Sequence, residues 1–129
     1  MNNLKDYQTF IDELINKFPE IENEILDDDY AGIISLQIGC FMRFTQNAIE
    51  TNNYKIVKKC FNFVDSNIGV VEHKIENSLI ISYIDKLDVK NANIEKLLTQ
   101  KLRKILIELN NYNTSSSKNI KLQNFLDSL

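Results

Sequence analysis

The sequence predicts an all-α protein, and three observations support this. Apolar residues recur at intervals of three and four in six segments, which is the spacing of amphipathic helices. The 129 residues include only three glycines and one proline, too few turn formers for an all-β domain. No segment shows the alternation of apolar and polar residues that marks a half-buried strand. We therefore expect an irregular helical bundle, or a short α-solenoid, of about six helices in antiparallel hairpins.

The first two helices are separated by a proline. The first is predicted over residues 4–18, because the residue before Pro19 is pushed out of helical geometry. Pro19 suits the first turn of a second, short helix, where its missing N–H is not needed. Asp27, Asp28 and Asp29 would lie unfavourably at the negative end of that helix, so we place them in the loop that follows.

The third helix is predicted over residues 33–51, the least polar segment of the chain. Its apolar residues cover two faces, which is typical of a central, buried helix. Gly39 lowers the helix propensity of this segment by about 1 kcal/mol. We therefore expect it to permit the close packing of a neighbouring element.

The remaining main helices are predicted over residues 54–64, 75–87 and 94–109. Asn52 and Asn53 form a tight turn before the first of them. Residues 65–69 form a stop signal after it, with Gly69 supplying the turn.

The chain is expected to form one core domain, residues 1–109, followed by a tail. Residues 110–119 are polar and predict a flexible linker. Residues 120–129 have apolar side chains at helical spacing and predict one short helix. Such a short helix is marginal alone, so we expect it to dock on the core.

Cys40 and Cys60 have apolar neighbours and are expected to be buried and reduced. The sequence has no CxxC motif and no Cys/His cluster, so we predict neither a metal site nor a cofactor. It shows no signal-peptide pattern and no run of about 18 apolar residues. We therefore expect a cytoplasmic protein that does not bind membranes.

The charge of the chain is polarised. Residues 1–50 hold ten acidic and three basic side chains, whereas residues 51–129 hold eight acidic and twelve basic ones. Six carboxylates fall between residues 20 and 29, with no Lys or Arg among them. Such a run attracts a basic partner and speeds its encounter, although a solvated turn that only aids solubility has the same composition. The candidate partner-binding residues are Glu20, Glu22, Glu24, Asp27, Asp28, Asp29 and Tyr30.

Catalysis, metal binding and nucleic-acid binding are not favoured. His73, the only histidine, has Glu76 and Ser78 at helical spacing, which is common by chance, so we predict no enzyme. Three consecutive aspartates do not match a calcium loop, whose ligands alternate around a central glycine. The sequence pI of about 5.2 lies far below the values above 9 that are typical of nucleic-acid-binding domains.

Several stretches together resemble a known family. They are residues 10–14 with 18–20, 32–46, 60–65 and 77–87, and the resemblance covers roughly residues 7–109. The family resembled is that of small all-helical bacterial immunity proteins of polymorphic toxin systems, including contact-dependent growth inhibition. The matching stretches form the core, so they specify the fold better than an interface.

The resemblance implies a protein that binds a toxin domain delivered by a neighbouring cell and neutralises it. Many such toxins are nucleases, and a nuclease presents a basic cleft to its nucleic acid. We therefore expect the partner to be a cognate toxin domain, with an RNase as the first candidate. An acidic surface of this protein would occlude the active site of that toxin. The alternative is a non-catalytic helical adaptor or regulatory protein that binds another cytosolic protein.

Overall fold

The computed structural model describes residues 3–113, and the prediction of an all-α fold is confirmed. This part of the chain contains helices and turns and no β-strand, apart from one isolated bridge between Lys5 and Val71. The elements are α1 Tyr7–Lys17, the 3₁₀ turn η1 Pro19–Ile21, α2 Glu22–Ile25, α3 Ile34–Glu50, α4 Tyr54–Asn67, α5 His73–Ser78, the π turn η2 Leu79–Tyr83, the 3₁₀ turn η3 Ile84–Lys86, α6 Ala92–Glu95 and α7 Gln100–Asn113.

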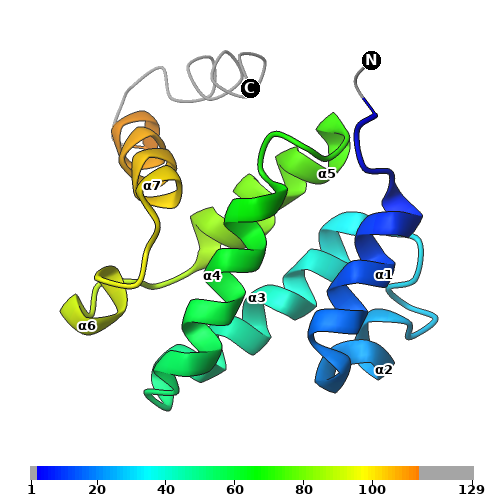
Figure 1. Cartoon of the computed structure of the whole chain (residues 1–129), viewed down its shortest axis with the longest axis horizontal. Coiled ribbons are helices and arrows are strands. Elements are labelled where there is room, and N and C mark those ends of the chain that lie inside the picture. The colour runs from blue at the N-terminus through cyan, green and yellow to red at the C-terminus, as the bar shows by residue number, and fades with distance from the viewer. Residues whose placement is uncertain (1–2, 114–129) are drawn as a thin grey trace.

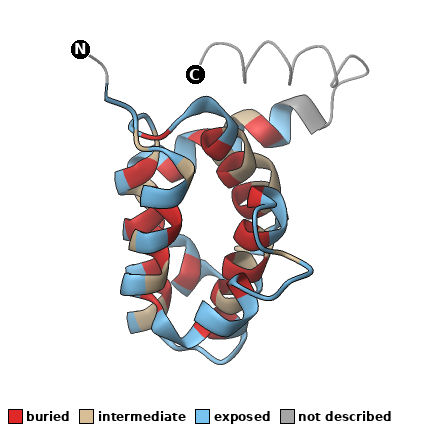
Figure 2. Cartoon of the chain, turned by 90° about the vertical axis from the view of Figure 1, so that its right-hand side faces the viewer, coloured by how far each residue is buried: buried red, intermediate tan, exposed pale blue. Residues whose placement is uncertain are grey.

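Helix α3 is the centre of a helical bundle (Figure 1). It packs against η1 and α2 on one side and against α4, α5 and η2 on the other, while α7 packs on α4 and η3. The predicted tight turn joins α3 to α4, with Asn52 in the left-handed region at φ 56°. Figure 2 shows the buried residues on the inward faces of the helices and the exposed ones outside.

Helix α1 begins at Tyr7, three residues after the predicted start at Leu4, and local side chains account for both of its ends. The side chain of Asp6 accepts the N–H of Thr9 at 2.9 Å, and this bond holds the pKa of the Asp6 carboxyl below its usual value. The helix ends at Lys17, and Pro19 opens η1, as predicted. Gly69, at φ 91°, forms the turn after α4.

A cluster of aromatic rings fills the core around α3. The Phe18 ring lies 5.0 Å from the Phe41 ring and 5.7 Å from the Phe63 ring, between centroids. Phe41 also stacks on Tyr83 at 4.8 Å. These rings come from the end of α1, the middle of α3, α4 and η2. The N-terminal helices and the later helices therefore share one core.

Two expectations for α3 were wrong. The helix is not buried on all sides, because Ile33 and Leu36 are 48% and 42% exposed. Nor does Gly39 admit a close neighbour, since the nearest atom to an added Cβ would be a side-chain nitrogen of Arg43 at 3.6 Å. The α2–α3 junction instead leaves this side of the helix open to solvent.

The later helices are more broken than their periodicity predicts. The segment predicted as one helix over 75–87 winds as α5, η2 and η3. The segment predicted as one helix over 94–109 is two, because the side chain of Thr99 accepts the N–H of Leu102 at 3.1 Å and starts α7 afresh. Ile94, Leu98 and Leu102 keep a spacing of four across this break, so the apolar pattern does not reveal it.

Helix α7 continues to Asn113, so residues 110–113 are helical and not part of a linker. The rest of the predicted linker, 114–119, and the predicted helix over 120–129 lie outside the described residues. Among the described residues, no helix has the length and apolar character needed to cross a membrane.

Both cysteines are buried and unpaired, as predicted. Burial raises the pKa of the Cys40 and Cys60 thiols from 9.0 to about 11. We expect the native protein to react with Ellman's reagent at pH 8 on the order of 100-fold more slowly than the guanidinium-unfolded protein, because little thiolate forms. Equal rates in the two states would contradict the burial of these side chains.

Candidate functional site

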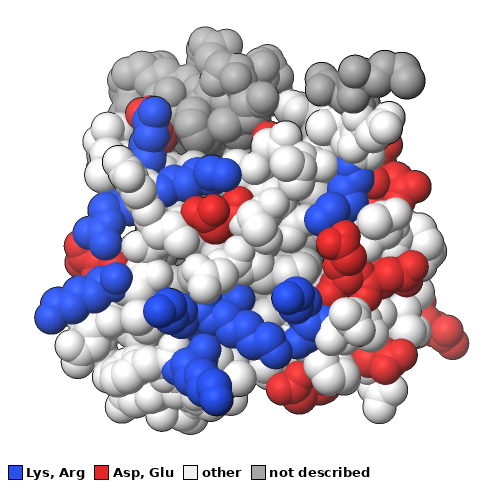
Figure 3. Space-filling model, in the orientation of Figure 1, with Lys and Arg blue, Asp and Glu red and all other residues white. Residues whose placement is uncertain are grey.

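The acidic segment, residues 20–29, covers η1, α2 and the turn after α2. Every one of its six carboxylate side chains is exposed. In Figure 3 the acidic side chains gather on the side formed by α1 and α2, whereas Lys and Arg are spread over α4, α6 and α7. The charge asymmetry of the sequence is thus an asymmetry of the molecular surface, which can orient a charged partner as it approaches.

The carboxylates of the segment differ in what they contact. Glu24 pairs with Arg43 at 3.4 Å, and both side chains are about half exposed, so the pair contributes little stability. One oxygen of Asp27 accepts the backbone N–H of Asp29 at 2.9 Å and shapes the turn. Within residues 3–113, the carboxylates of Glu20, Glu22, Asp28 and Asp29 have no hydrogen bond or ion pair. These four groups are available to a partner.

Tyr30 differs from the other candidate residues because it is half-buried and packs against the core. Its carbonyl accepts the N–H of Ile33 at 3.0 Å, and its own N–H bonds the carbonyl of Asp27 at 2.9 Å. Tyr30 therefore attaches the turn to the core, whereas the three aspartate side chains of the turn are exposed to solvent.

A hydrogen-bond network that sequence reasoning missed, centred on the buried side chain of Gln37, holds both ends of this turn. The Gln37 side chain donates to the carbonyl of Ile25 at 3.0 Å and accepts the hydroxyl of Tyr7 at 2.8 Å. The same Tyr7 oxygen accepts the N–H of Gly32 at 3.0 Å, where Gly32 has a φ of 83°. We call this network the Tyr7–Gln37 clamp. Its signal in the sequence is a glutamine between Leu36 and Ile38 in a largely apolar helix, and this side chain is completely buried in the structure.

Three exposed apolar side chains surround the same turn. Leu26 caps the end of α2 and is 47% exposed; Ile33 and Leu36 occupy the start of α3. Leu36 lies one turn beyond Ile33, since its N–H bonds the Ile33 carbonyl at 3.1 Å. We call Leu26, Ile33 and Leu36 the apolar patch. Its residues lie at the α2–α3 junction, and Asp27, Asp28 and Asp29 fall between Leu26 and Ile33 in the chain.

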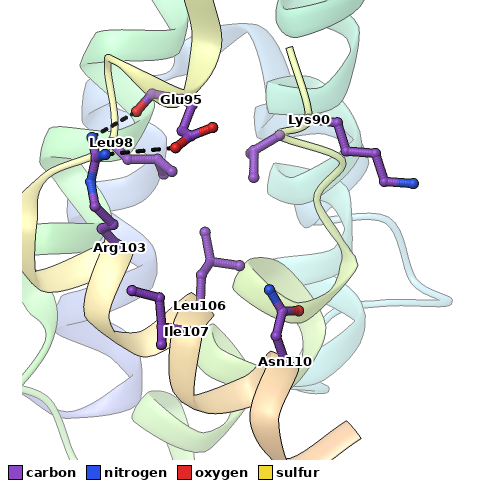
Figure 4. Close-up of a pocket in the computed structure, with 8 residues that line it drawn as sticks. Lys90, Glu95, Leu98, Arg103, Leu106, Ile107 and Asn110 are labelled. Atoms are coloured by element: carbon purple, nitrogen blue, oxygen red, sulfur yellow. Dashed lines mark hydrogen bonds and ion pairs between the residues drawn. The ribbon is translucent and has the colours of Figure 1, made fainter. Parts of the chain in front are cut away.

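A separate groove of about 310 Å³ lies between the 87–91 connection and α7. Figure 4 shows Leu98, Leu106 and Ile107 along it, with Arg103 bonded to Glu95 at one end and the ammonium group of Lys90 turned away. None of the predicted partner-binding residues lines this groove. Among the described residues, no three His, Cys, Asp or Glu side chains come together in a way that could hold a metal ion.

His73 and Glu76, both on α5, differ in their surroundings. His73 is exposed at the start of α5. Glu76 is 5% exposed and accepts the N–H of Gly69, so its carboxylate closes the turn between α4 and α5. This use of Glu76 is structural.

Comparison with known proteins assigns most of the chain to one family. The family model for a domain of unknown function, DUF7674, matches residues 11–114. The chain belongs to the DUF7674 family. No curated protein and no solved structure matches the chain.

The DUF7674 region contains the acidic segment, the apolar patch, Gln37 and the groove beside α7. Tyr7 lies before it, so one half of the Tyr7–Gln37 clamp belongs to the matched domain and the other half to the preceding residues. The family description names no activity, and the function must be inferred from the surface itself.

Proposed function

We propose that this protein is an immunity protein that binds a cognate toxin domain in the cytoplasm and blocks its active site. The proposed toxin is an RNase with a basic cleft, and the acidic segment is the surface that enters it. The protein would act by binding alone, without catalysis, metal or cofactor.

The observation that carries the proposal is a set of exposed, unpaired carboxylates on a turn with fixed ends. On this turn, Asp28 and Asp29 make no side-chain hydrogen bond or ion pair, and the repulsion between their carboxylates costs the fold stability. The Tyr7–Gln37 clamp holds both ends of the turn, at Ile25 and Gly32, which lowers the entropy lost on binding.

The proposed mechanism is replacement of phosphate by carboxylate. An RNase cleft carries Lys and Arg side chains that bind RNA phosphates. Asp28 and Asp29, at the tip of the turn, would accept charge-assisted hydrogen bonds from those cations. Glu20 and Glu22, further along η1 and α2, would mainly speed the approach of the toxin.

Changing Asp27, Asp28 and Asp29 together to asparagine tests this mechanism. Asparagine at 27 keeps an oxygen that can accept the Asp29 N–H, so the turn is retained. We expect association with the toxin encoded by the neighbouring gene to slow by roughly tenfold or more at low ionic strength, with a smaller difference at high salt. Stopped-flow association and an RNA-cleavage assay measure the two effects.

The control triple variant, Glu50→Gln, Glu72→Gln and Glu108→Gln, removes the same charge away from α1 and α2. It should bind almost as the parent does. If the Asp27–Asp29 variant and this control inhibit equally well at low ionic strength, the acidic segment only aids solubility. Failure of the parent protein to inhibit the toxin would overturn the proposed function itself.

The second candidate function is a helical adaptor, and the groove beside α7 favours it. The groove has an apolar floor, and Ile107 at its edge is 55% exposed. A partner helix could bury these side chains. The acidic segment would then be a solvated surface.

A further inference from the structure

We propose that the apolar patch of Leu26, Ile33 and Leu36 is the centre of the partner interface and that the acidic segment is its rim. This inference rests on the proposed function and deepens it. Carboxylates alone would give fast association, whereas an apolar centre would give a slow dissociation.

The strongest evidence is the residue that begins α3. Ile33 occupies the N-cap position and makes no side-chain capping bond. Ser, Thr, Asp and Asn are favoured there because their side chains accept a free N–H of the first turn, and isoleucine is among the poorest choices. The side chain is also 48% exposed, so much of its apolar surface contacts only water. The fold thus gains little from isoleucine at this position, and a partner that covers the side chain would gain much.

Leu26 and Leu36 are the other exposed apolar residues of the junction, at 47% and 42% exposure. Leu26 directly follows Ile25, whose carbonyl is bonded to Gln37, the residue after Leu36. The clamp therefore ties the end of α2 to the start of α3, the two segments whose backbone carries these apolar residues. A rigid apolar centre surrounded by charged groups is the usual anatomy of a protein–protein interface.

The charges around the apolar patch indicate which kind of partner surface it would bind. The adjoining Asp27, Asp28 and Asp29 are exposed and lie between Leu26 and Ile33 in the chain. A second copy facing the patch through the same surface would bring its own aspartates against them, and the two sets would repel. The fitting occupant is a protein surface with an apolar knob or pocket ringed by Lys and Arg, which is the rim of a basic nuclease cleft.

Because isoleucine is a poor N-cap for α3, a substitution at residue 33 can test this inference without destabilising the fold. Ile33→Ser should keep or raise the melting temperature, because serine can cap α3. The same change should speed dissociation from the cognate toxin domain by about tenfold, with little change in the association rate. Leu36→Ala, at an exposed helix position where alanine is well tolerated, should do likewise. Ile107→Ser, which removes an equally exposed isoleucine on α7, is the matched control and should dissociate at the parental rate.

The outcomes separate the inference from the proposed function. If the parent binds the toxin and both patch variants dissociate as it does, the patch is not the interface, although the immunity function stands. If the parent does not bind the toxin, the proposed function fails, and this inference fails with it. If sedimentation shows that the parent protein is a dimer and that Ile33→Ser converts it to a monomer, a second copy of the chain covers the apolar patch. The proposed partner chemistry would then be wrong.

Discussion

Replacing Gln37 by leucine is expected to lower the free energy of unfolding by about 2–3 kcal/mol, although leucine is apolar and similar in size. The substitution removes the donor to the Ile25 carbonyl and the acceptor of the Tyr7 hydroxyl. Because Gln37 is completely buried, water cannot easily replace these bonds. Urea unfolding followed by circular dichroism measures the loss.

Gln37→Leu should also weaken toxin inhibition, although the buried side chain at this position does not contact the partner. The substitution releases the Ile25 carbonyl, and it removes the acceptor that orients the Tyr7 hydroxyl, which in turn holds the N–H of Gly32. Both ends of the acidic turn are then held less firmly, so binding must order it. Hydrogen exchange should quicken at Gly32, whose N–H is bonded to Tyr7.

Gln46→Leu is the matched control for this prediction. It makes the same chemical change in the same helix, but Gln46 is only half-buried and holds the N–H of Asp88, far along the chain. We expect a loss of about 1 kcal/mol or less and unchanged inhibition. If Gln37→Leu proved as stable as the parent, the clamp would not be needed to hold the junction.

Replacing Phe41 by alanine is expected to be the most destabilising single change considered, at about 3–5 kcal/mol. The Phe41 ring contacts the rings of Phe18, Phe63 and Tyr83 at 4.8–5.7 Å, and its side chain is fully buried. Removing it leaves a cavity where α1, α3, α4 and η2 meet. Guanidinium denaturation, monitored by circular dichroism, gives the change.

Phe44→Ala provides the comparison, because Phe44 lies on the same helix but is half-buried and contacts the Phe18 ring at 5.7 Å. Its loss should be clearly smaller, since a cavity open to solvent can fill or collapse. Phe41→Leu should recover part of the stability by refilling the space. Equal losses for the two alanine variants would place the centre of the core elsewhere.

Local sequence determined much of the fold. The three-and-four spacing, Pro19 and Gly69 were sufficient to predict an all-α chain, the end of α1, the start of η1 and the turn after α4. These features depend on backbone sterics and on neighbours within a few residues, which a sequence displays directly. The aspartates after α2 were correctly placed in a loop for the same reason.

The break between α6 and α7 shows where such reasoning stops. The apolar spacing from Ile94 to Leu102 suits one helix or two, because both bury the same side chains. The Thr99 cap and the packing of α7 on α4 select the second arrangement. Likewise, the exposure of Leu36 depends on which sides of α3 its neighbours cover.

For the candidate site, the sequence by itself determined the acidic composition and its place before α3, but not its geometry. Tertiary structure decided that Tyr30 anchors the turn, that Ile33 is an exposed and poor cap, and that Gln37 joins Ile25 to Tyr7. These last contacts link residues 12 and 30 positions apart. A hydrogen bond over such a separation forms only after the helices have packed, so no local pattern of residues records it.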